Sequence, residues 1–414
     1  MKLSDRTVLF DYHGIPILGS KLTGNVIGLS ADGLELCRRM AVTDIDPAEA
    51  AATDPALAAA LEQGGFLEGA PKPAPGAKSA YVHVTQRCNL RCLGCYSDGT
   101  GRNRLADPPV AALARAFETL AAWGAGSIII SGGEPFLRPD LPQICQAARE
   151  AGIGHITVLS NGLALSPEAL RAAAPFVDCV SISFDGASAD APAHIRGKQS
   201  FDTLCAGLDA IAAAGMAPHI IATIHRLNTG DLEAYVRLSQ QKGATLNFSL
   251  LSCCTGDALA PLIHDGDSLR NLGRGMFALG EVLPQAALDA PLSVNLALKD
   301  ACGAGRGTLS LDADGTVYPC HMLHCPEFAF GNAFTDDAGR LFGSEAARRF
   351  EALDFDSIGE CAACAYGPFC GGGCRARAFH GSGSLEAKDP FCAMIREFYG
   401  LLGRTLAERF GAAG

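Results

Sequence analysis

Cysteine is the residue type with the most chemical potential in this sequence, because the 414-residue chain contains 17 of them. An odd number of thiols does not suit a scaffold of disulfides, and the first residues, MKLSDRT, carry an acid where a secretion signal needs an apolar run. In a reducing compartment, clustered thiols are best explained as metal ligands and isolated thiols as core residues. The sequence therefore predicts a cytoplasmic metalloprotein.

The first cluster of thiols is Cys88, Cys92 and Cys95, spaced C-x3-C-x2-C and followed directly by Tyr96. Three thiols in one loop can bind one metal centre. Three thiolates suit a [4Fe–4S] cluster and leave one iron without a protein ligand, where a small chelating molecule can bind. A structural zinc site with its fourth ligand elsewhere in the chain is the alternative.

A second group of thiols lies in the C-terminal region, in the order C-x12-G-x4-C, then C-x2-C-x5-C-x3-C, then one last cysteine. A zinc ribbon is the simpler interpretation of such a group, and iron–sulfur clusters are the other. The candidate ligands are Cys302, Cys320, Cys361, Cys364, Cys370, Cys374 and Cys392.

Alternating strands and helices between residues 80 and 252 must position the first cluster. The fold class that this alternation predicts is α/β, an open partial (β/α)6 barrel of right-handed units. In such barrels the chemistry sits in the loops after the strands, and Cys88 follows the first strand directly. The expected strands are Tyr81–Thr85, Ser127–Ser131, His155–Ser160, Cys179–Phe184, His219–Ile224 and Thr245–Leu251.

Four further segments complete the predicted organisation. Residues 1–70 contain a hairpin, a third strand and helices, which resembles a winged-helix module, and residues 71–79 form a proline-rich linker. Residues 253–300 bridge the barrel to residues 301–414. This last region is rich in Gly and Cys and ends in a helix. Because it cannot bury much apolar surface, we expect it to need metal for stability.

The first thiol spacing, at the end of the first barrel strand, resembles the radical S-adenosylmethionine (SAM) superfamily. The loops after the next three strands are similar to the family's GGEP, S/T-N-G and S-x-D-G segments, and the segment from His194 to Gly197 is similar to its H-x-x-R-G segment. Segments of this kind also occur as ordinary turns. The residues that the resemblance implies in SAM binding are Tyr96, Gly132, Gly133, Glu134, Pro135, Ser160, Asn161, Ser183 and Arg196.

The same resemblance implies roles for these residues. The main chain of the GGEP loop would hold the SAM amino group, near a carboxylate suited to a cation, and the main chain of Tyr96 would face the adenine. Ser183 and Arg196 would contact the carboxylate and ribose side, and guanidinium binds carboxylate in a bidentate manner. The family cleaves SAM reductively to a 5′-deoxyadenosyl radical, which removes a hydrogen atom from the substrate.

The C-terminal thiols resemble the SPASM domain, which implies two auxiliary clusters and three [4Fe–4S] clusters in total. Sulfatase-maturating members carry a further thiol where Gly303–Asp314 has none, and an Asp where this chain has His321. The first auxiliary cluster is therefore expected to have an open iron, unless Cys325 or the Cys253–Cys254 pair closes it. The implied ligand sets are Cys302, Cys320 and Cys374 for the first cluster, and Cys361, Cys364, Cys370 and Cys392 for the second.

The N-terminal segment resembles the PqqD-like element that recognises precursors of ribosomally made, modified peptides. Such modules bind a leader peptide by strand addition at the edge of the third strand, here Asn25, Val26, Ile27, Gly28 and Leu29. A winged-helix DNA binder is the alternative. The net charge of −11 and the lack of a basic helix disfavour it.

These patterns together predict a radical SAM oxidoreductase that modifies a ribosomal precursor peptide, by forming a thioether or another crosslink, with a flavodoxin or ferredoxin as electron donor. A folded protein or a small molecule is the alternative substrate, and an iron–sulfur electron-transfer protein without SAM chemistry is the alternative of another class. The sequence has no block of basic residues, so we expect no nucleic-acid partner. We also expect no membrane span, because no apolar stretch reaches the roughly 18 to 20 residues that are needed.

Overall fold

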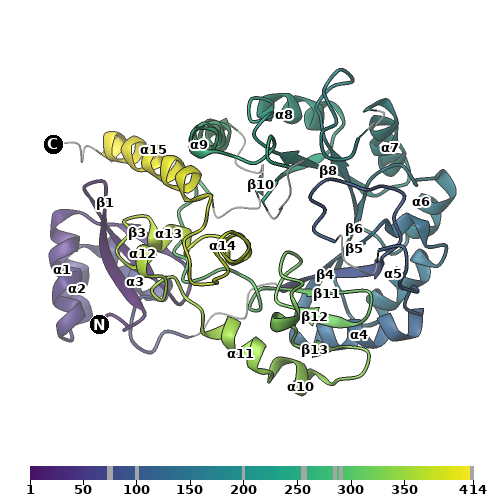
Figure 1. Cartoon of the computed structure of the whole chain (residues 1–414). Helices are drawn as coiled ribbons and strands as arrows, with labels where there is room; N and C mark the ends of the chain where they lie inside the picture. Colours follow the sequence, from purple (N-terminus) through teal and green to yellow (C-terminus); the bar gives the residue numbers. More distant parts are fainter. Residues whose placement is uncertain are drawn as a thin grey trace.

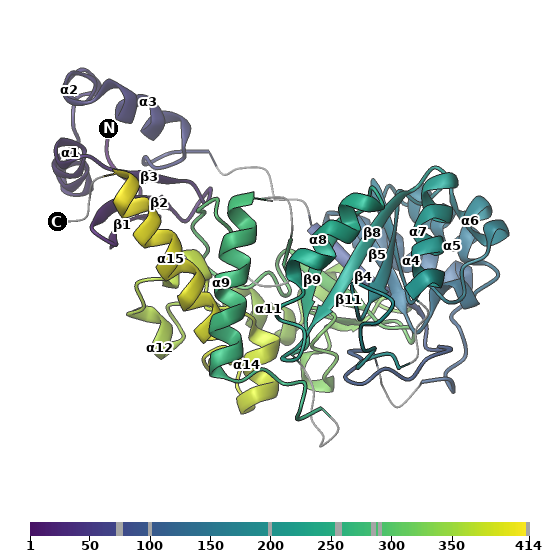
Figure 2. The same cartoon turned by 90° about the horizontal axis from the view of Figure 1, so that it is seen from above.

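The computed structural model describes residues 1–71, 78–97, 102–197, 201–252, 259–282, 287–288 and 292–410. The N-terminal module and the last helix lie at one end of the molecule and the barrel at the other (Figure 1). Strands and helices of the C-terminal region lie between them, in contact with both (Figures 1 and 2).

The N-terminal module is a three-stranded antiparallel sheet with three helices, in the strand order β1-β2-β3. Ser30 caps the first helix, because its Oγ accepts a hydrogen bond from Gly33 N at 3.1 Å. The module has a core of its own, to which Leu18, Leu36 and Phe66 contribute. Its elements are β1 (Thr7–Tyr12), β2 (Ile15–Ser20), β3 (Val26–Gly28), α1 (Ala31–Val42), α2 (Pro47–Thr53) and α3 (Pro55–Gln63).

Six parallel strands in sequential order form the barrel part of a ten-stranded sheet. Their β-branched and aromatic residues, such as Val82, Ile128, Val158 and Phe184, are buried in one continuous core. Each predicted strand is present, with ends that differ by a few residues. The strands are β4 (Lys78–Thr85), β5 (Ala125–Gly132), β6 (His155–Ser160), β7 (Cys179–Phe184), β8 (Ala217–Ile224) and β9 (Thr245–Leu250).

Helices cover the outer face of this sheet (Figure 2). Their apolar faces, which include Leu113, Ile144 and Leu208, pack into the same core as the strands. These helices are α4 (Val110–Trp123), α5 (Leu141–Glu150), α6 (Pro167–Ala173), α7 (Phe201–Ala213) and α8 (Leu232–Gln241), and the short helix η1 (Pro135–Leu137) follows β5.

The sheet extends beyond the six strands that we predicted. At one edge β10 (Ala287–Leu288) pairs with β9, and at the other β11 (Thr308–Leu311) pairs in parallel with β4, placing Leu311 opposite Val82. β12 (Thr316–Tyr318) and β13 (Gly331–Asn332) continue this edge in antiparallel pairing. Backbone groups at the edge of β4 need partners, and the C-terminal region supplies them. The segment after β12 that contains Cys320 thereby lies near the first barrel strand, where the rings of His321 and Tyr81 stack with centroids 4.0 Å apart.

Two long helices connect the barrel to the N-terminal module. α9 (Gly266–Val282) packs along α15 (Cys392–Phe410), as Figure 2 shows, and Arg274 Nε donates a hydrogen bond to Glu397 Oε1 at 2.8 Å. The module is attached to α15 by a hydrogen bond of 2.6 Å from the Tyr12 hydroxyl to the Tyr399 carbonyl. The remaining elements are η2 (Pro326–Phe328), α10 (Ala338–Phe342), α11 (Glu345–Ala352), α12 (Gly359–Ala362), α13 (Gly367–Cys370) and α14 (Arg375–Ser382).

None of the helices in the described ranges combines the length and the hydropathy needed to cross a membrane.

Candidate functional site

The loop that carries Cys88, Cys92 and Cys95 is bonded to the loop after β5. Gly133 N donates to Thr85 O and Glu134 N donates to Arg87 O, each at 2.8 Å. A Cβ atom on Gly133 would lie 2.0 Å from Arg87 O, so this approach of two backbones requires glycine. The glycines of the GGEP segment therefore hold the cysteine loop in place.

Glu134 lies behind this loop and is fully buried. We expected its carboxylate to suit a cationic ligand, but the carboxylate accepts hydrogen bonds from Ser160 Oγ, Asn161 N and Phe136 N at 2.9, 2.8 and 3.1 Å. Burial raises its pKa to about 6, against the opposing effect of these donors. The Glu134 side chain thus connects the loops after β5 and β6.

Two further contacts join the cysteine loop to the loops after β6 and β7. Asn161 Nδ2 donates to Asn89 Oδ1 at 2.7 Å, and Leu93 N donates to Ile195 O at 2.8 Å. Three successive strand-end loops therefore hold Cys88–Cys95, and these contacts come from the chain itself.

A cavity of about 190 Å³ opens beside the cysteine loop, at the strand ends of the barrel. The predicted residues Cys92, Cys95, Tyr96, Ser183 and Arg196 all line it. Six other residues predicted to bind SAM are absent from the lining of this cavity in the described part of the chain. They are Gly132, Gly133, Glu134, Pro135, Ser160 and Asn161. The C-terminal region closes the far side with His321 and Met322.

Arg196 is oriented by Asp185, a residue to which we had assigned no role beyond its motif. The two side chains form an ion pair in which Asp185 is 1% exposed and Arg196 is 13% exposed. Asp185 Oδ2 also accepts hydrogen bonds from Arg196 N at 2.6 Å and Ile195 N at 3.2 Å, and the Arg196 guanidinium donates to Thr223 Oγ1 at 3.2 Å. The partly exposed guanidinium is therefore held at the wall of the cavity, where it could bind a carboxylate.

Two sulfur atoms in the first group of thiols, those of Cys88 and Cys95, receive hydrogen bonds from the chain. Leu90 N donates to Cys88 Sγ at 3.5 Å, and Cys95 Sγ accepts from the Arg102 guanidinium at 3.5 Å and lies 3.3 Å from Ser97 Oγ. Burial raises the pKa of Cys92 to about 11. Donors of this kind stabilise thiolates that bind iron, so the loop fits an iron–sulfur cluster.

Four C-terminal thiols gather around a second, smaller cavity of about 20 Å³. They are the predicted second set, Cys361, Cys364, Cys370 and Cys392, and Lys388 and Arg396 also line the cavity. Burial raises the pKa of Cys370 to about 12, and the other three thiols act in the same direction. Four thiols with two nearby cations suit an anionic metal–thiolate centre.

The predicted first auxiliary set is brought together in part. Burial and the nearby thiol of Cys302 raise the pKa of Cys374 to about 11, against the effect of Arg377. Gly305 N donates to Pro319 O at 2.8 Å, which places the loop after Cys302 beside Cys320. Cys325 precedes η2, and Cys253 and Cys254 lie outside the described residues, so the fourth ligand that we considered stays a prediction. All cysteines in the described ranges are free thiols.

Known family models and proteins match the chain over most of its length. The model of the radical SAM superfamily matches residues 82–238, and the model of the SPASM iron–sulfur cluster-binding domain matches residues 302–365. "Mycofactocin maturase MftC" of Mycobacterium tuberculosis is 32% identical over 319 residues, which are 75% of this chain and 81% of the relative. "PqqA peptide cyclase" of Ruegeria pomeroyi is 30% identical over 362 residues, 82% of this chain and 94% of the relative.

A solved structure agrees with the fold of nearly the whole chain. Streptococcus suis SuiB bound to precursor peptide SuiA has a TM-score of 0.62 at 15% identity, and the likeness covers 94% of this chain and 99% of that one. The part of this chain that the likeness does not cover is much shorter than residues 1–70. Most of the N-terminal module therefore lies within the likeness. The arrangement of thiols, strand-end loops and cavity, together with these matches, establishes that the chain belongs to the radical SAM superfamily of enzymes, among the members with a C-terminal SPASM domain.

Proposed function

We propose that this enzyme is a peptide maturase that binds SAM beside a [4Fe–4S] cluster on Cys88, Cys92 and Cys95, and that it forms a thioether or another crosslink in a ribosomal precursor peptide. The observation that carries this proposal is the cavity that Cys92 and Cys95 line together with Ser183 and Arg196. When bound, the cluster and SAM supply a 5′-deoxyadenosyl radical that removes a hydrogen atom from the substrate.

The residues of the chain bind and orient the cofactor in this proposal. Arg196, held by Asp185, binds the carboxylate of SAM, and Ser183 lies on the same wall of the cavity. The main chain of Gly132–Pro135 holds the amino group, and the main chain of Tyr96 faces the adenine. Ser160 and Asn161 act through Glu134, because their hydrogen bonds fix the loop that carries this backbone.

Two auxiliary [4Fe–4S] clusters complete the proposed cofactor set of three. Cys361, Cys364, Cys370 and Cys392 supply four thiolates to one of them, which saturates its protein ligands. Cys302, Cys320 and Cys374 supply three thiolates to the other. An open iron there would be available to a substrate thiolate, which favours a thioether among the possible crosslinks. A flavodoxin or ferredoxin delivers the electron.

The leader of the peptide docks on β3 in this proposal. Ser20 N donates to Asn25 O and Leu29 N donates to Pro16 O, so these residues pair with β2. In an antiparallel pair the residues between such bonds point their N–H and C=O groups outward, which here applies to Val26 and Gly28. Their free backbone groups can bind an added strand. Two relatives named for maturing mycofactocin and cyclising the PqqA peptide, and the SuiB complex with its precursor, support a peptide substrate.

The test has two stages. Anaerobic protein reduced with dithionite should convert SAM to 5′-deoxyadenosine, and a protein that releases none would contradict the radical chemistry. Co-expression with a short precursor peptide encoded beside the gene should then yield a peptide lighter by two hydrogens for each oxidative crosslink, measured by mass spectrometry.

A matched pair of variants tests the docking edge. Val26→Pro removes one outward N–H without removing a bond to β2, whereas Val26→Ala keeps it. We expect the proline variant to lose peptide modification and to keep its production of 5′-deoxyadenosine, while the alanine variant keeps both. Equal modification by the two variants would place the leader elsewhere.

A further inference from the structure

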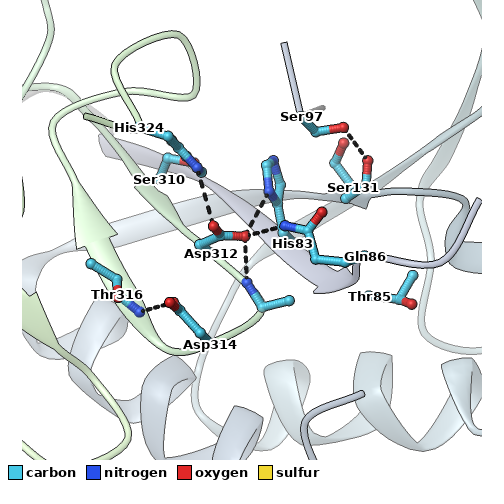
Figure 3. A network of polar contacts seen from close by, with 12 residues as sticks. His83, Thr85, Gln86, Ser97, Ser131, Ser310, Asp312, Asp314, Thr316 and His324 are labelled. Atoms are coloured by element: carbon cyan, nitrogen blue, oxygen red, sulfur yellow. Dashed lines mark hydrogen bonds and ion pairs between the residues drawn. The ribbon is translucent and has the colours of Figure 1, made fainter. Parts of the chain in front are cut away.

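Three side chains with metal-binding chemistry meet where β4 and the C-terminal hairpin join. His83 comes from β4, Asp312 follows β11, and His324 lies in the segment after Cys320 (Figure 3). One ligand atom from each side chain can be chosen so that all three lie within 4.8 Å of one another. These residues are outside both thiol sets, and the function proposed above does not use them.

The spacing of these atoms is longer than that of ordinary hydrogen bonds. His83 Nδ1 lies 3.3 Å from Asp312 Oδ1, and His324 Nδ1 lies 3.6 Å from Asp312 Oδ2. Hydrogen bonds between nitrogen and oxygen centre near about 2.9–3.0 Å. Ligand atoms bound to one tetrahedral metal ion at about 2.0–2.1 Å lie roughly 3.4 Å apart. The separation of His324 Nδ1 and Asp312 Oδ2 is therefore close to the edge of such a tetrahedron. His83 Nδ1 contacts the other oxygen, Oδ1, which leaves Nε2 as the ligand atom of His83.

Two of the three residues, His83 and Asp312, also have an atom available to an ion among the described residues. His83 is completely buried, and its Nε2 has no hydrogen-bond partner among the described residues. Asp312 Oδ1 accepts from Gln86 Nε2 at 2.6 Å and from Ala313 N at 2.7 Å, whereas the contact that the described residues give to Oδ2 is the distant His324 nitrogen. An unpaired buried nitrogen is costly unless something binds it.

Neighbouring groups orient the triad as they do around known metal centres. His324 Nε2 lies 2.8 Å from Ser310 Oγ, which leaves Nδ1 directed at Asp312, and Gln86 holds the carboxylate (Figure 3). Ligands of bound metals usually have such outer partners.

We propose that His83, Asp312 and His324 bind one divalent transition-metal ion, of the class of Zn²⁺, that joins the first barrel strand to the C-terminal hairpin. Two imidazole nitrogens and one carboxylate oxygen favour zinc or iron(II) over Mg²⁺ and Ca²⁺, which take oxygen ligands. The ion neutralises a carboxylate at the interface of two regions and binds the unpaired nitrogen.

Zinc binding to the cluster-loaded enzyme tests this site. The protein with reconstituted clusters is incubated anaerobically with ZnCl2 and desalted, and zinc and iron are counted by plasma mass spectrometry. We expect wild type to retain about one more zinc ion per chain than Asp312→Asn, with unchanged iron content. X-ray absorption at the zinc edge should show nitrogen and oxygen ligands at about 2.0–2.1 Å and no sulfur shell near about 2.3 Å.

Asp314→Asn is the matched control, because Asp314 lies in the same turn and its Oδ1 accepts from Thr316 N at 2.8 Å. It should retain the zinc that Asp312→Asn loses, and His324→Gln should lose it too. Equal zinc in wild type and Asp312→Asn would overturn the site and leave a hydrogen-bonded network. A zinc edge dominated by sulfur would do the same, because the ion would then lie on cysteines.

Discussion

The two groups of cysteines are held in place by different physics. Cys88–Cys95 lies on loops at the ends of parallel strands whose side chains form a continuous core, and hydrogen bonds from three neighbouring loops position it. Four of the C-terminal thiols, Cys361, Cys364, Cys370 and Cys374, lie on or beside α12, α13 and α14, which have four, four and eight residues, whereas Cys392 begins the 19-residue α15. Helices as short as α12, α13 and α14 are not stable alone. The comparison teaches that contacts of the chain itself shape the barrel site, whereas we expect the short C-terminal helices to depend also on metal. The expectation that this region buries little apolar surface was wrong, because residues such as Leu311, Phe328 and Phe369 are buried in the same core as the barrel.

The C-terminal region has one strong support of its own. Arg377 and Asp389 form an ion pair in which the side chains are 1% and 2% exposed, and Asp389 Oδ2 also accepts from Cys374 N at 2.7 Å. A buried carboxylate that holds both a guanidinium and a ligand loop links the stability of the region to the geometry of its thiols.

Removing the ligands should give the largest difference between the two regions. Replacing Cys361 and Cys364 by alanine removes half of one thiol set, and metal–thiolate sites contribute about 10 kcal/mol or more to small domains. We expect the C-terminal region to become sensitive to limited proteolysis, with cuts near these positions.

The matched variant replaces Cys88 and Cys92 by alanine. It should abolish 5′-deoxyadenosine production while the barrel stays resistant to protease. Equal protease sensitivity of the two double variants would refute the comparison.

Breaking the buried ion pair should give the next largest effect. Asp389→Asn leaves the Arg377 guanidinium buried without its charge partner, which costs about 3–5 kcal/mol. We expect a lower unfolding temperature for the C-terminal region and loss of its iron, measured by calorimetry and iron content.

Glu168→Gln breaks a pair with Arg171 whose side chains are 76% and 66% exposed. Because both side chains are exposed to solvent, we expect no measurable change in the unfolding temperature. A similar loss of stability from both substitutions would contradict the role of Asp389.

Adding one methyl group at Gly133 tests whether close backbone contact positions the cysteine loop of the barrel. Gly133→Ala places a Cβ 2.0 Å from Arg87 O and displaces the cysteine loop, and a misplacement of about 1 Å can cost roughly 100-fold in rate. We expect slower 5′-deoxyadenosine formation and little change in the unfolding temperature.

Gly126→Ala is the control on β5, the strand before Gly133, because a Cβ there meets nothing within 4 Å. Equal rates for the two alanine variants would show that the loop does not depend on this backbone contact.

Local patterns predicted the six barrel strands, because strand periodicity depends on residues within a few positions of one another. The grouping of Cys361, Cys364, Cys370 and Cys392 around one cavity was expected from the resemblance to the SPASM domain. The pairing of β11 with β4 was missed, because each strand alone gives no sign of its partner. The orientation of Arg196 by Asp185 was missed for a related reason, since an Asp before Gly is also an ordinary turn residue.

By itself the sequence determined that three closely spaced thiols follow the first barrel strand, because this spacing and the alternation of strands and helices depend on residues that are near one another in the chain. The tertiary structure alone decided that Glu134 faces its own chain and that His83 meets Asp312 across 229 positions. These contacts follow from how the sheet closes on the C-terminal hairpin, and packing of the whole core sets that closure.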